Sequence, residues 1–331
     1  MKSVICSLIL VFCLSEIALS QLKFFSDPFA HTYSIVARDP ETGEMGVAVQ
    51  SHWFSVGSIV AWGEAGVGVV ATQSFVNVSF GPRGLALLKR GKTANQVVEA
   101  LIASDDGRDV RQLAVLGADG SVEAYTGNNC IPGAGHIVGE NFSVQANLMK
   151  NDKVWPAMAE AFENSTGPLA ERLIITLEAA QNAGGDIRGK QSASILIVKG
   201  ESSGKVWEDK LIDLRVEDHP EPVKELKRLL RVFRAYEHMN NGDLAVEHGD
   251  MRLAMEEYST AESMFPDNEE MKYWHAVTLV NNGDLNSALP LFKSVFEKNG
   301  EWLELTPRLV PIGLLNVSDE ELQRILSVLE N

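Results

Sequence analysis

Two nearly unbroken apolar segments near the start of the chain limit most strongly what it can fold into. The segments MGVAVQS (Met45–Ser51) and GVGVVATQS (Gly66–Ser74) are short and consist mainly of small and β-branched residues. A strand with one face in water alternates apolar and polar residues, so continuous apolar character predicts strands that are covered on both faces. The chain must therefore supply a layer on each side of these strands.

Further strands and two pairs of helices can supply these layers. The strands are expected at Thr32–Arg38, Arg111–Gly127 (a hairpin that turns at Asp119-Gly120), Ser143–Met149, Gln191–Gly200 and Gly204–Val216. The helices are expected from Pro82 to Gly91, from Thr93 onward with Gln96 at the capping-box spacing, at Val154–Ser165 and at Pro168–Ala183. This order predicts an α+β fold, a four-layer αββα sandwich in which helices cover both outer faces of two stacked sheets.

The composition changes at EDHPEPVKELKRLL, where Pro220 and Pro222 mark a domain boundary and the pattern becomes helical. We therefore expect the sandwich domain to cover residues 32–216. A linker helix at residues 217–234 and an all-α domain at residues 235–331 are expected to follow.

The all-α segment contains a repeat of 34 residues. Gly249-Asp250 recurs as Gly283-Asp284, Ala254 as Ala288 and Tyr258 as Phe292, and Gly242, Ala261 and Pro266 fit the same pattern. Small residues let paired helices approach, and the aromatic residue fills the gap between them. The pattern resembles tetratricopeptide repeats, one clear and one degraded; a plain pair of helical hairpins is the alternative. Two units expose two ends, so we expect this module to pack on the first domain or on a protein partner.

The first twenty residues, MKSVICSLILVFCLSEIALS, have the pattern of a secretory signal peptide. Lys2 precedes an apolar run, and small residues precede a cut between Ser20 and Gln21. A membrane anchor is the alternative, but the apolar run is short and Glu16 interrupts its end. We expect an exported protein, secreted or periplasmic, in which residues 21–31 form an N-terminal extension or a propeptide.

Charge and cysteine content exclude several classes of function. The formal net charge of −16 argues against nucleic acid or an anionic membrane surface as a partner. Cys130 is the only cysteine after the predicted signal peptide, so no intrachain disulfide is expected. Cys130 could form a thiol–imidazole pair with His136, but their Pro/Gly-rich setting favours a structural loop. Since no zinc spacing, P-loop or dinucleotide fingerprint occurs, we expect neither a metal nor a cofactor.

Two polar segments are candidates for a site. In QNAGGDIRGKQSAS, the residues Asp186, Arg188, Gln191 and Ser192 lie between a helix end and an apolar strand. They either brace a loop or form the rim of a site for a carboxylate or an amide, because arginine suits bidentate carboxylate recognition. Gln73 and Asn77 follow another buried strand. Their side-chain amides either cap a turn or donate to an oxyanion.

Thr32 stands at the head of the first strand. Alternation along the strand places Thr32 and Ser34 on one face. A free N-terminal threonine can activate its own hydroxyl, because its α-amine, with a pKa of roughly 7.7–8.0, can accept the proton. Ordinary strand propensity is the alternative, since threonine is common in strands.

Six segments together carry a resemblance to a known family: TYSIVARDPETGEMGVAVQS, GVGVVATQ, GPRGL, CIPGAGHIVG, MAEAFENSTGPLAERL and AGGDIRGKQSASILIV. Over about residues 32–216 the chain resembles the domain-of-unknown-function 1028 family, which is grouped with the Ntn (N-terminal nucleophile) hydrolases. The resemblance implies the αββα sandwich and an amide-bond hydrolase with Thr32 as nucleophile. It also implies that Asp186, Arg188, Gln191 and Ser192 are site residues.

The leading hypothesis is therefore hydrolysis of an amide bond in a peptide or acylamino compound. It places Thr32 as nucleophile with Ser34 beside it, Gln73 or Asn77 at the oxyanion, and Arg188 on a substrate carboxylate. It requires a second cut, between His31 and Thr32, because otherwise the nitrogen of Thr32 is a peptide nitrogen. The alternative is a non-catalytic binding module of the same fold, whose helical repeats dock a protein partner.

Overall fold

The computed structural model describes residues 28–330 and divides the chain into two compact units, one that ends at Lys227 and one that begins at Arg228. The predicted signal peptide (1–20) and residues 21–27 of the predicted extension lie outside the described residues. Within residues 28–330, no helix combines the length and the apolar character that crossing a bilayer requires.

Two antiparallel sheets form the centre of the first unit. One has the order β1-β5-β6-β7, with β4 also paired to β5; its strands are β1 (Phe29–Ala30), β4 (Ala61–Glu64), β5 (Gly68–Phe75), β6 (Arg111–Gly117) and β7 (Val122–Thr126). The other has the order β11-β10-β3-β2-β9-β8; its strands are β2 (Thr32–Arg38), β3 (Met45–Ser51), β8 (Gly135–Gly139), β9 (Phe142–Ala146), β10 (Ser192–Val198) and β11 (Lys210–Val216). The chain therefore passes from the first sheet to the second between β1 and β2.

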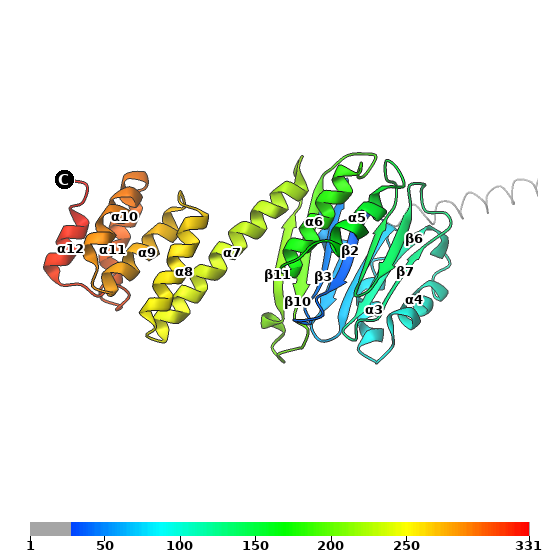
Figure 1. Ribbon diagram of the computed structural model, residues 1–331, viewed down its shortest axis with the longest axis horizontal. Helices are drawn as coiled ribbons and strands as arrows, with labels where there is room; N and C mark the ends of the chain where they lie inside the picture. Colours follow the sequence, from blue (N-terminus) through cyan, green and yellow to red (C-terminus); the bar gives the residue numbers. More distant parts are fainter. Residues whose placement is uncertain (1–27, 331) are drawn as a thin grey trace, which may run out of the picture. The chain divides into compact units, whose positions relative to one another are not determined.

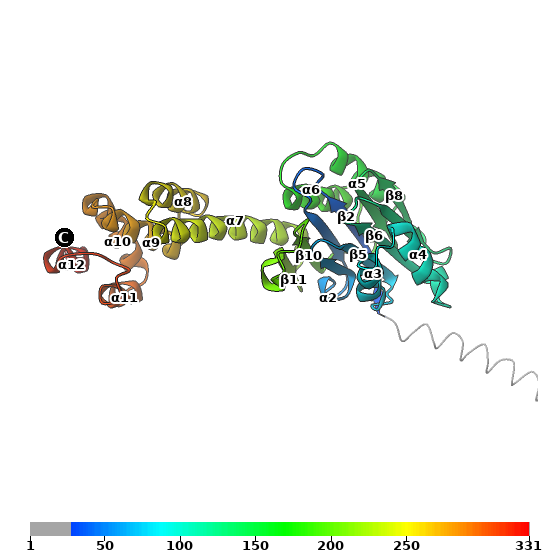
Figure 2. The same ribbon diagram turned by 90° about the horizontal axis from the view of Figure 1, so that it is seen from below.

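Two pairs of helices cover the outer faces of the sheets (Figures 1 and 2). Helices α3 (Phe80–Leu88) and α4 (Ala94–Ala103) pack on β5, β6 and β7. Helices α5 (Val154–Glu163) and α6 (Leu169–Asn182) pack on β2, β3, β8 and β9. The predicted four-layer αββα sandwich is confirmed, and so is the capping box of Thr93 and Gln96 at the start of α4.

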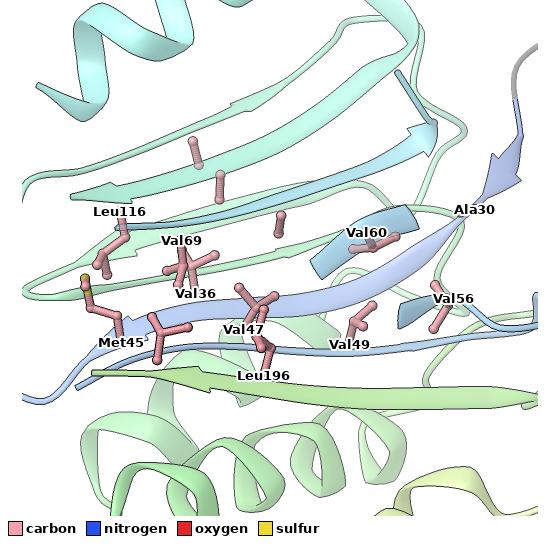
Figure 3. Packing of buried hydrophobic residues seen from close by; sticks show 14 of the residues in the cluster. Ala30, Val36, Met45, Val47, Val49, Val56, Val60, Val69, Leu116 and Leu196 are labelled. Carbon is pink, nitrogen blue, oxygen red and sulfur yellow. The ribbon is translucent and has the colours of Figure 1, made fainter. Parts of the chain in front are cut away.

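The layer between the two sheets is apolar along most of its length (Figure 3). Val36, Val47 and Val49 of the second sheet meet Val69 and Leu116 of the first, and all five side chains are fully buried. Residues of β3 that alternate with these face α6 instead, and a Cβ atom at Gly46 would lie only 2.8 Å from Leu173 of that helix. Strand β3 is thus covered on both faces, as its continuous apolar sequence predicts.

Two parts of the first unit differ from the sequence-based expectation. A short helix, α2 (Gly57–Val60), and β4 were not anticipated. The expectation of a structural loop across CIPGAGHIVG was wrong in its second half, because β8 pairs there with β9. The glycines of β8 make room for aromatic rings: a Cβ would lie 2.6 Å from Trp155 at Gly135 and 2.1 Å from Phe142 at Gly139. Here glycine permits close packing on a strand instead of marking a turn.

The second unit is helical throughout its named elements. Helix α7 (Pro222–Glu247) starts in the first unit and is followed by α8 (Met251–Met264), α9 (Glu269–Asn281), α10 (Leu285–Lys298), α11 (Glu301–Leu309) and α12 (Asp319–Leu326). The expected boundary at residues 234 and 235 falls inside the continuous α7.

The sequence repeat corresponds to a repeated local structure. Gly249 and Gly283 have φ angles of +75° and +82°, and each precedes an aspartate that caps the next helix. Gly242 of α7 lies against Tyr258 of α8 so closely that a Cβ would stand 2.8 Å from the ring. In this pair of helices, a small residue of one helix and an aromatic residue of the next are in contact.

Candidate functional site

Thr32 begins β2 at the point where the chain crosses between the sheets. Its side chain is fully buried, and its hydroxyl donates to the carbonyl oxygen of Ala30 at 2.6 Å. Ala30 belongs to β1, which pairs with Ser74 and Phe75 of β5. Because the nitrogen of Thr32 is bonded to His31, it is a peptide nitrogen in this chain and cannot accept a proton.

The carbonyl oxygen of His31, in the peptide bond to Thr32, accepts two side-chain hydrogen bonds. Ser51 Oγ donates to it at 2.6 Å and Arg188 Nη2 donates at 2.6 Å. Ser51 ends β3 directly opposite Thr32 in the register of the sheet, whereas Arg188 comes from the loop between α6 and β10. One hydroxyl and one guanidinium thus converge on a single carbonyl oxygen, an arrangement that stabilises negative charge on that oxygen.

Asp186 holds the guanidinium of Arg188 in this position. Its two carboxylate oxygens accept from Arg188 Nε at 3.0 Å and from Nη2 at 2.6 Å. The carboxylate also accepts from the backbone amides of Arg188 (2.9 Å) and His52 (3.3 Å). The side chain of Asp186 is fully buried. Bidentate pairing of this kind fixes the plane of the guanidinium as well as its position.

The side chain of His31 is buried beside the same peptide bond. Its Nδ1 lies 2.6 Å from Asn147 Oδ1, and its ring meets the ring of Phe75 edge-on, with centroids 5.4 Å apart. Burial is the largest influence on this imidazole and lowers its pKa below the usual 6.5, while the hydrogen bond to Asn147 acts in the opposite direction. The ring is therefore neutral near pH 7.

A network of buried amides lies around Thr32 on the inner face of the sandwich. Ser34 Oγ donates to Gln73 Oε1 and accepts from Gln145 Nε2, each at 2.6 Å. Gln73 Nε2 donates to Gln112 Oε1 at 2.6 Å and to the carbonyl oxygen of Thr32 at 3.3 Å. These side chains are fully buried. The network joins both sheets and fixes the backbone at the start of β2.

The structure brings together five of the residues proposed from sequence. Thr32, Ser34 and Gln73 lie in or beside the amide network, and Arg188, held by Asp186, binds the carbonyl oxygen of His31, the neighbour of Thr32. The other three lie elsewhere in the hydrogen-bond pattern. Asn77 donates to Asp105 and accepts from Ser79. The side-chain amide of Gln191 donates to Asp218. The hydroxyl of Ser192 donates to the carbonyl oxygen of Trp53 and accepts from the amide of Val56, so it holds the loop after β3.

Five residues of this region were not identified from the sequence: His31, Ser51, Gln112, Gln145 and Asn147. The common signal is a polar residue at the end of an apolar strand, as in GVAVQS and SVQAN. This signal alone does not say which strand ends meet.

Cys130 and His136 have separate hydrogen-bond partners, and His136 is linked to the amide network through Thr126, whose hydroxyl accepts from Gln112 Nε2 at 2.8 Å. The thiol of Cys130 donates to the carbonyl oxygen of Arg111, and burial raises its pKa. His136 Nδ1 lies 2.8 Å from Thr126 Oγ1. Among residues 28–330, no group of three His, Cys, Asp or Glu side chains is placed to hold a metal ion.

Comparison with known proteins gives one family match. The profile of a family of unknown function, DUF1028, matches residues 32–226. No curated protein matches the chain.

Two solved structures align with about three fifths of the chain. The DUF1028 protein SPO2555 from Silicibacter pomeroyi is 30% identical, with a TM-score of 0.56 over 61% of this chain and 85% of that chain. Anbu (ancestral beta-subunit) from Yersinia bercovieri is 12% identical, with a TM-score of 0.29 over 60% of this chain and 92% of that chain.

Proposed function

This chain belongs to DUF1028, a family of unknown function, and we propose that it is an amide-bond hydrolase whose nucleophile, Thr32, is released by cleavage of the His31–Thr32 bond. The observation that carries the proposal is the pair of donors, Ser51 and Arg188, on the carbonyl oxygen of that bond. A carbonyl oxygen bound by one hydroxyl and one cation is prepared for the charge that develops when a nucleophile adds to its carbon.

Release of Thr32 follows from this arrangement in two steps. The hydroxyl oxygen of Thr32 adds to the carbonyl carbon of His31 and gives up its proton to the nitrogen of Thr32, while the oxyanion that forms remains bound to Ser51 and Arg188. The C–N bond then breaks to leave an ester of Thr32 and a free amine. Water hydrolyses the ester, so that His31 ends in a carboxylate and Thr32 begins the chain with its hydroxyl restored.

The released amine supplies a reusable base for the hydroxyl of Thr32, which the intact chain lacks. In the intact chain the hydroxyl of Thr32 donates to the carbonyl oxygen of Ala30, and the nitrogen of Thr32 is a peptide nitrogen that can take the proton only once, as its own bond breaks. An N-terminal amine with a pKa of roughly 7.7–8.0 can take this proton at neutral pH. Thr32 then attacks the amide of a substrate. The amine that leaves the substrate takes the proton from the N-terminal amine of Thr32, and water hydrolyses the acyl-enzyme.

The competing function is a non-catalytic binding module in which the extension is retained. Its support is the integration of the extension into the fold, since β1 pairs with β5 and Ala30 is fully buried. In that case the helical repeats of the second unit dock a protein partner. Both functions include export as a proposal, which rests on the sequence pattern of residues 1–20 alone.

The experiment compares chains that differ only at their start. One begins at Thr32 and the other begins at Thr32→Ala. Each is screened for release of a fluorescent amine from a panel of acylamino amides. We expect activity only from the chain with a free Thr32, with a rate that rises as pH passes through the pKa of its amine. Equal activity of the Thr32→Ala chain, or no activity from any chain, contradicts the proposed hydrolase.

A further inference from the structure

His31 occupies the position that the acyl side of a substrate must take. In the proposed function, the same hydroxyl of Thr32 and the same donors, Ser51 and Arg188, serve both the release of Thr32 and the attack on a substrate. The residue on the acyl side of the bond is His31 in the first reaction, and the corresponding residue of the substrate in the second. Once the extension has left, the space of the His31 ring is therefore open to the substrate.

We propose that the space vacated by His31 is the acyl pocket of the enzyme, and that it selects peptides whose acyl-side residue is histidine or another planar ring that donates a hydrogen bond. The inference rests on the proposed function, because it assumes that Thr32 is released and acts as the nucleophile. It adds the class of substrate, which neither the family match nor the proposed reaction specifies.

The hydrogen bonds around the pocket show that a side chain bound there must donate a hydrogen bond to Asn147 Oδ1. Gln112 Nε2 faces the backbone carbonyl oxygens of Ala146 (2.9 Å) and Gly135 (3.3 Å), which can only accept hydrogen bonds. The Oε1 atom of Gln112 must therefore accept, and it does so from Asn147 Nδ2 at 2.8 Å. This leaves Asn147 Oδ1 facing the ring of His31, so that Nδ1 of the histidine carries the proton and donates.

The walls of the pocket exclude charged side chains. The ring of His31 is 1% exposed and packs edge-on against Phe75. A carboxylate in this space would face the oxygen of Asn147, and an ammonium group would lose its water. A phenyl ring would fit but would leave Asn147 Oδ1 buried without a donor, which we expect to lower binding by roughly 10-fold to 100-fold.

The backbone before His31 supplies a second element of recognition. Phe29 and Ala30 pair with Phe75 and Ser74 at the edge of the first sheet, and the amide of Val76 donates to the carbonyl oxygen of Pro28 at 2.9 Å. A substrate peptide can repeat this pairing as an added strand. The sequence Pro-Phe-Ala-His of this chain is therefore a direct probe of the pocket.

The activity test uses the chain that begins at Thr32 and acetyl-Pro-Phe-Ala-X-aminocoumarin substrates in which X is His, Phe or Glu. We expect the highest kcat/KM with His, a value about 10–100-fold lower with Phe, and the lowest with Glu. In the variant Asn147→Leu, the preference for His over Phe should disappear. Hydrolysis without a preference for His overturns the acyl pocket and leaves the proposed hydrolase intact.

A binding test does not depend on activity. The chain that begins at Thr32→Ala is titrated by calorimetry with the free acids Pro-Phe-Ala-His and Pro-Phe-Ala-Glu, whose terminal carboxylate can meet Ser51 and Arg188. Tighter binding of the peptide that ends in His supports the pocket. Equal binding of the two peptides, or no binding of either, overturns it. Absence of hydrolysis by the Thr32 chain with any amide is instead a failure of the proposed function.

Discussion

Substitution of Ser51 tests the proposed cleavage of the His31–Thr32 bond most selectively. The variant Ser51→Ala removes the hydroxyl that donates to the carbonyl oxygen of His31 at 2.6 Å and leaves the donor Arg188 in place. Loss of one donor from an oxyanion site costs about 2.7–4 kcal/mol in the transition state, which corresponds to a rate about 100–1000-fold lower. The cost to the free energy of unfolding is smaller, about 1 kcal/mol, because the carbonyl oxygen keeps one partner. Release of Thr32 should therefore slow far more than the fold is weakened.

The assay follows the mass of freshly synthesised chain over time and compares half-times of cleavage. Ser192→Ala is the matched control, because Ser192 pairs with Ser51 on the next strand, is equally buried and bonds only to the loop after β3. We expect the control to be cleaved within a few-fold of the wild-type rate. Cleavage of Ser51→Ala as fast as the control would refute the role of Ser51 as a donor to the oxyanion.

Three further predictions concern the stability of the two units. Gln73→Leu removes the centre of the buried amide network and should lower the free energy of unfolding of the first unit by about 2–4 kcal/mol in urea titrations, whereas Gln191→Leu should change it by less than about 0.5 kcal/mol. Burial lowers the pKa of His136 below 6.5, so the unfolded chain binds the proton first as pH falls; stability should decline below about pH 6.5, and His136→Gln should make that decline shallower. Asp284→Ala removes the cap of α10 and should destabilise the second unit by about 1 kcal/mol in thermal melts, with no effect on the melting of the first.

The layers of the fold could be predicted because a strand that is buried on both faces has a continuous apolar sequence. Strand β3 reads as a continuous apolar run since α6 covers one face and the first sheet covers the other. Strand β8 could not be recognised, because its glycines make room for Phe142 of the paired strand β9 and Trp155 of α5, and those contacts form only when the hairpin and the helix that covers it have folded. A glycine at a turn and a glycine under a ring look the same in the sequence.

The part of the site that lies on a single strand could also be predicted from the sequence. Alternation along one strand places Thr32 and Ser34 on the same face without knowledge of any neighbour. The bond between Ser34 and Gln73, in contrast, joins two sheets and depends on how they stack. The contact of Arg188 with His31 joins residues 157 positions apart, and its acceptor is a backbone oxygen, which every residue carries. No side-chain pattern could have indicated it.

The most direct test of the account is the identity of the first residue in the purified, folded wild-type protein, measured by intact mass and by sequencing from the N-terminus. The account predicts a chain that begins at Thr32, together with a Thr32→Ala variant that keeps the bond to residue 31. A folded wild-type protein in which the His31–Thr32 bond remains intact would contradict it.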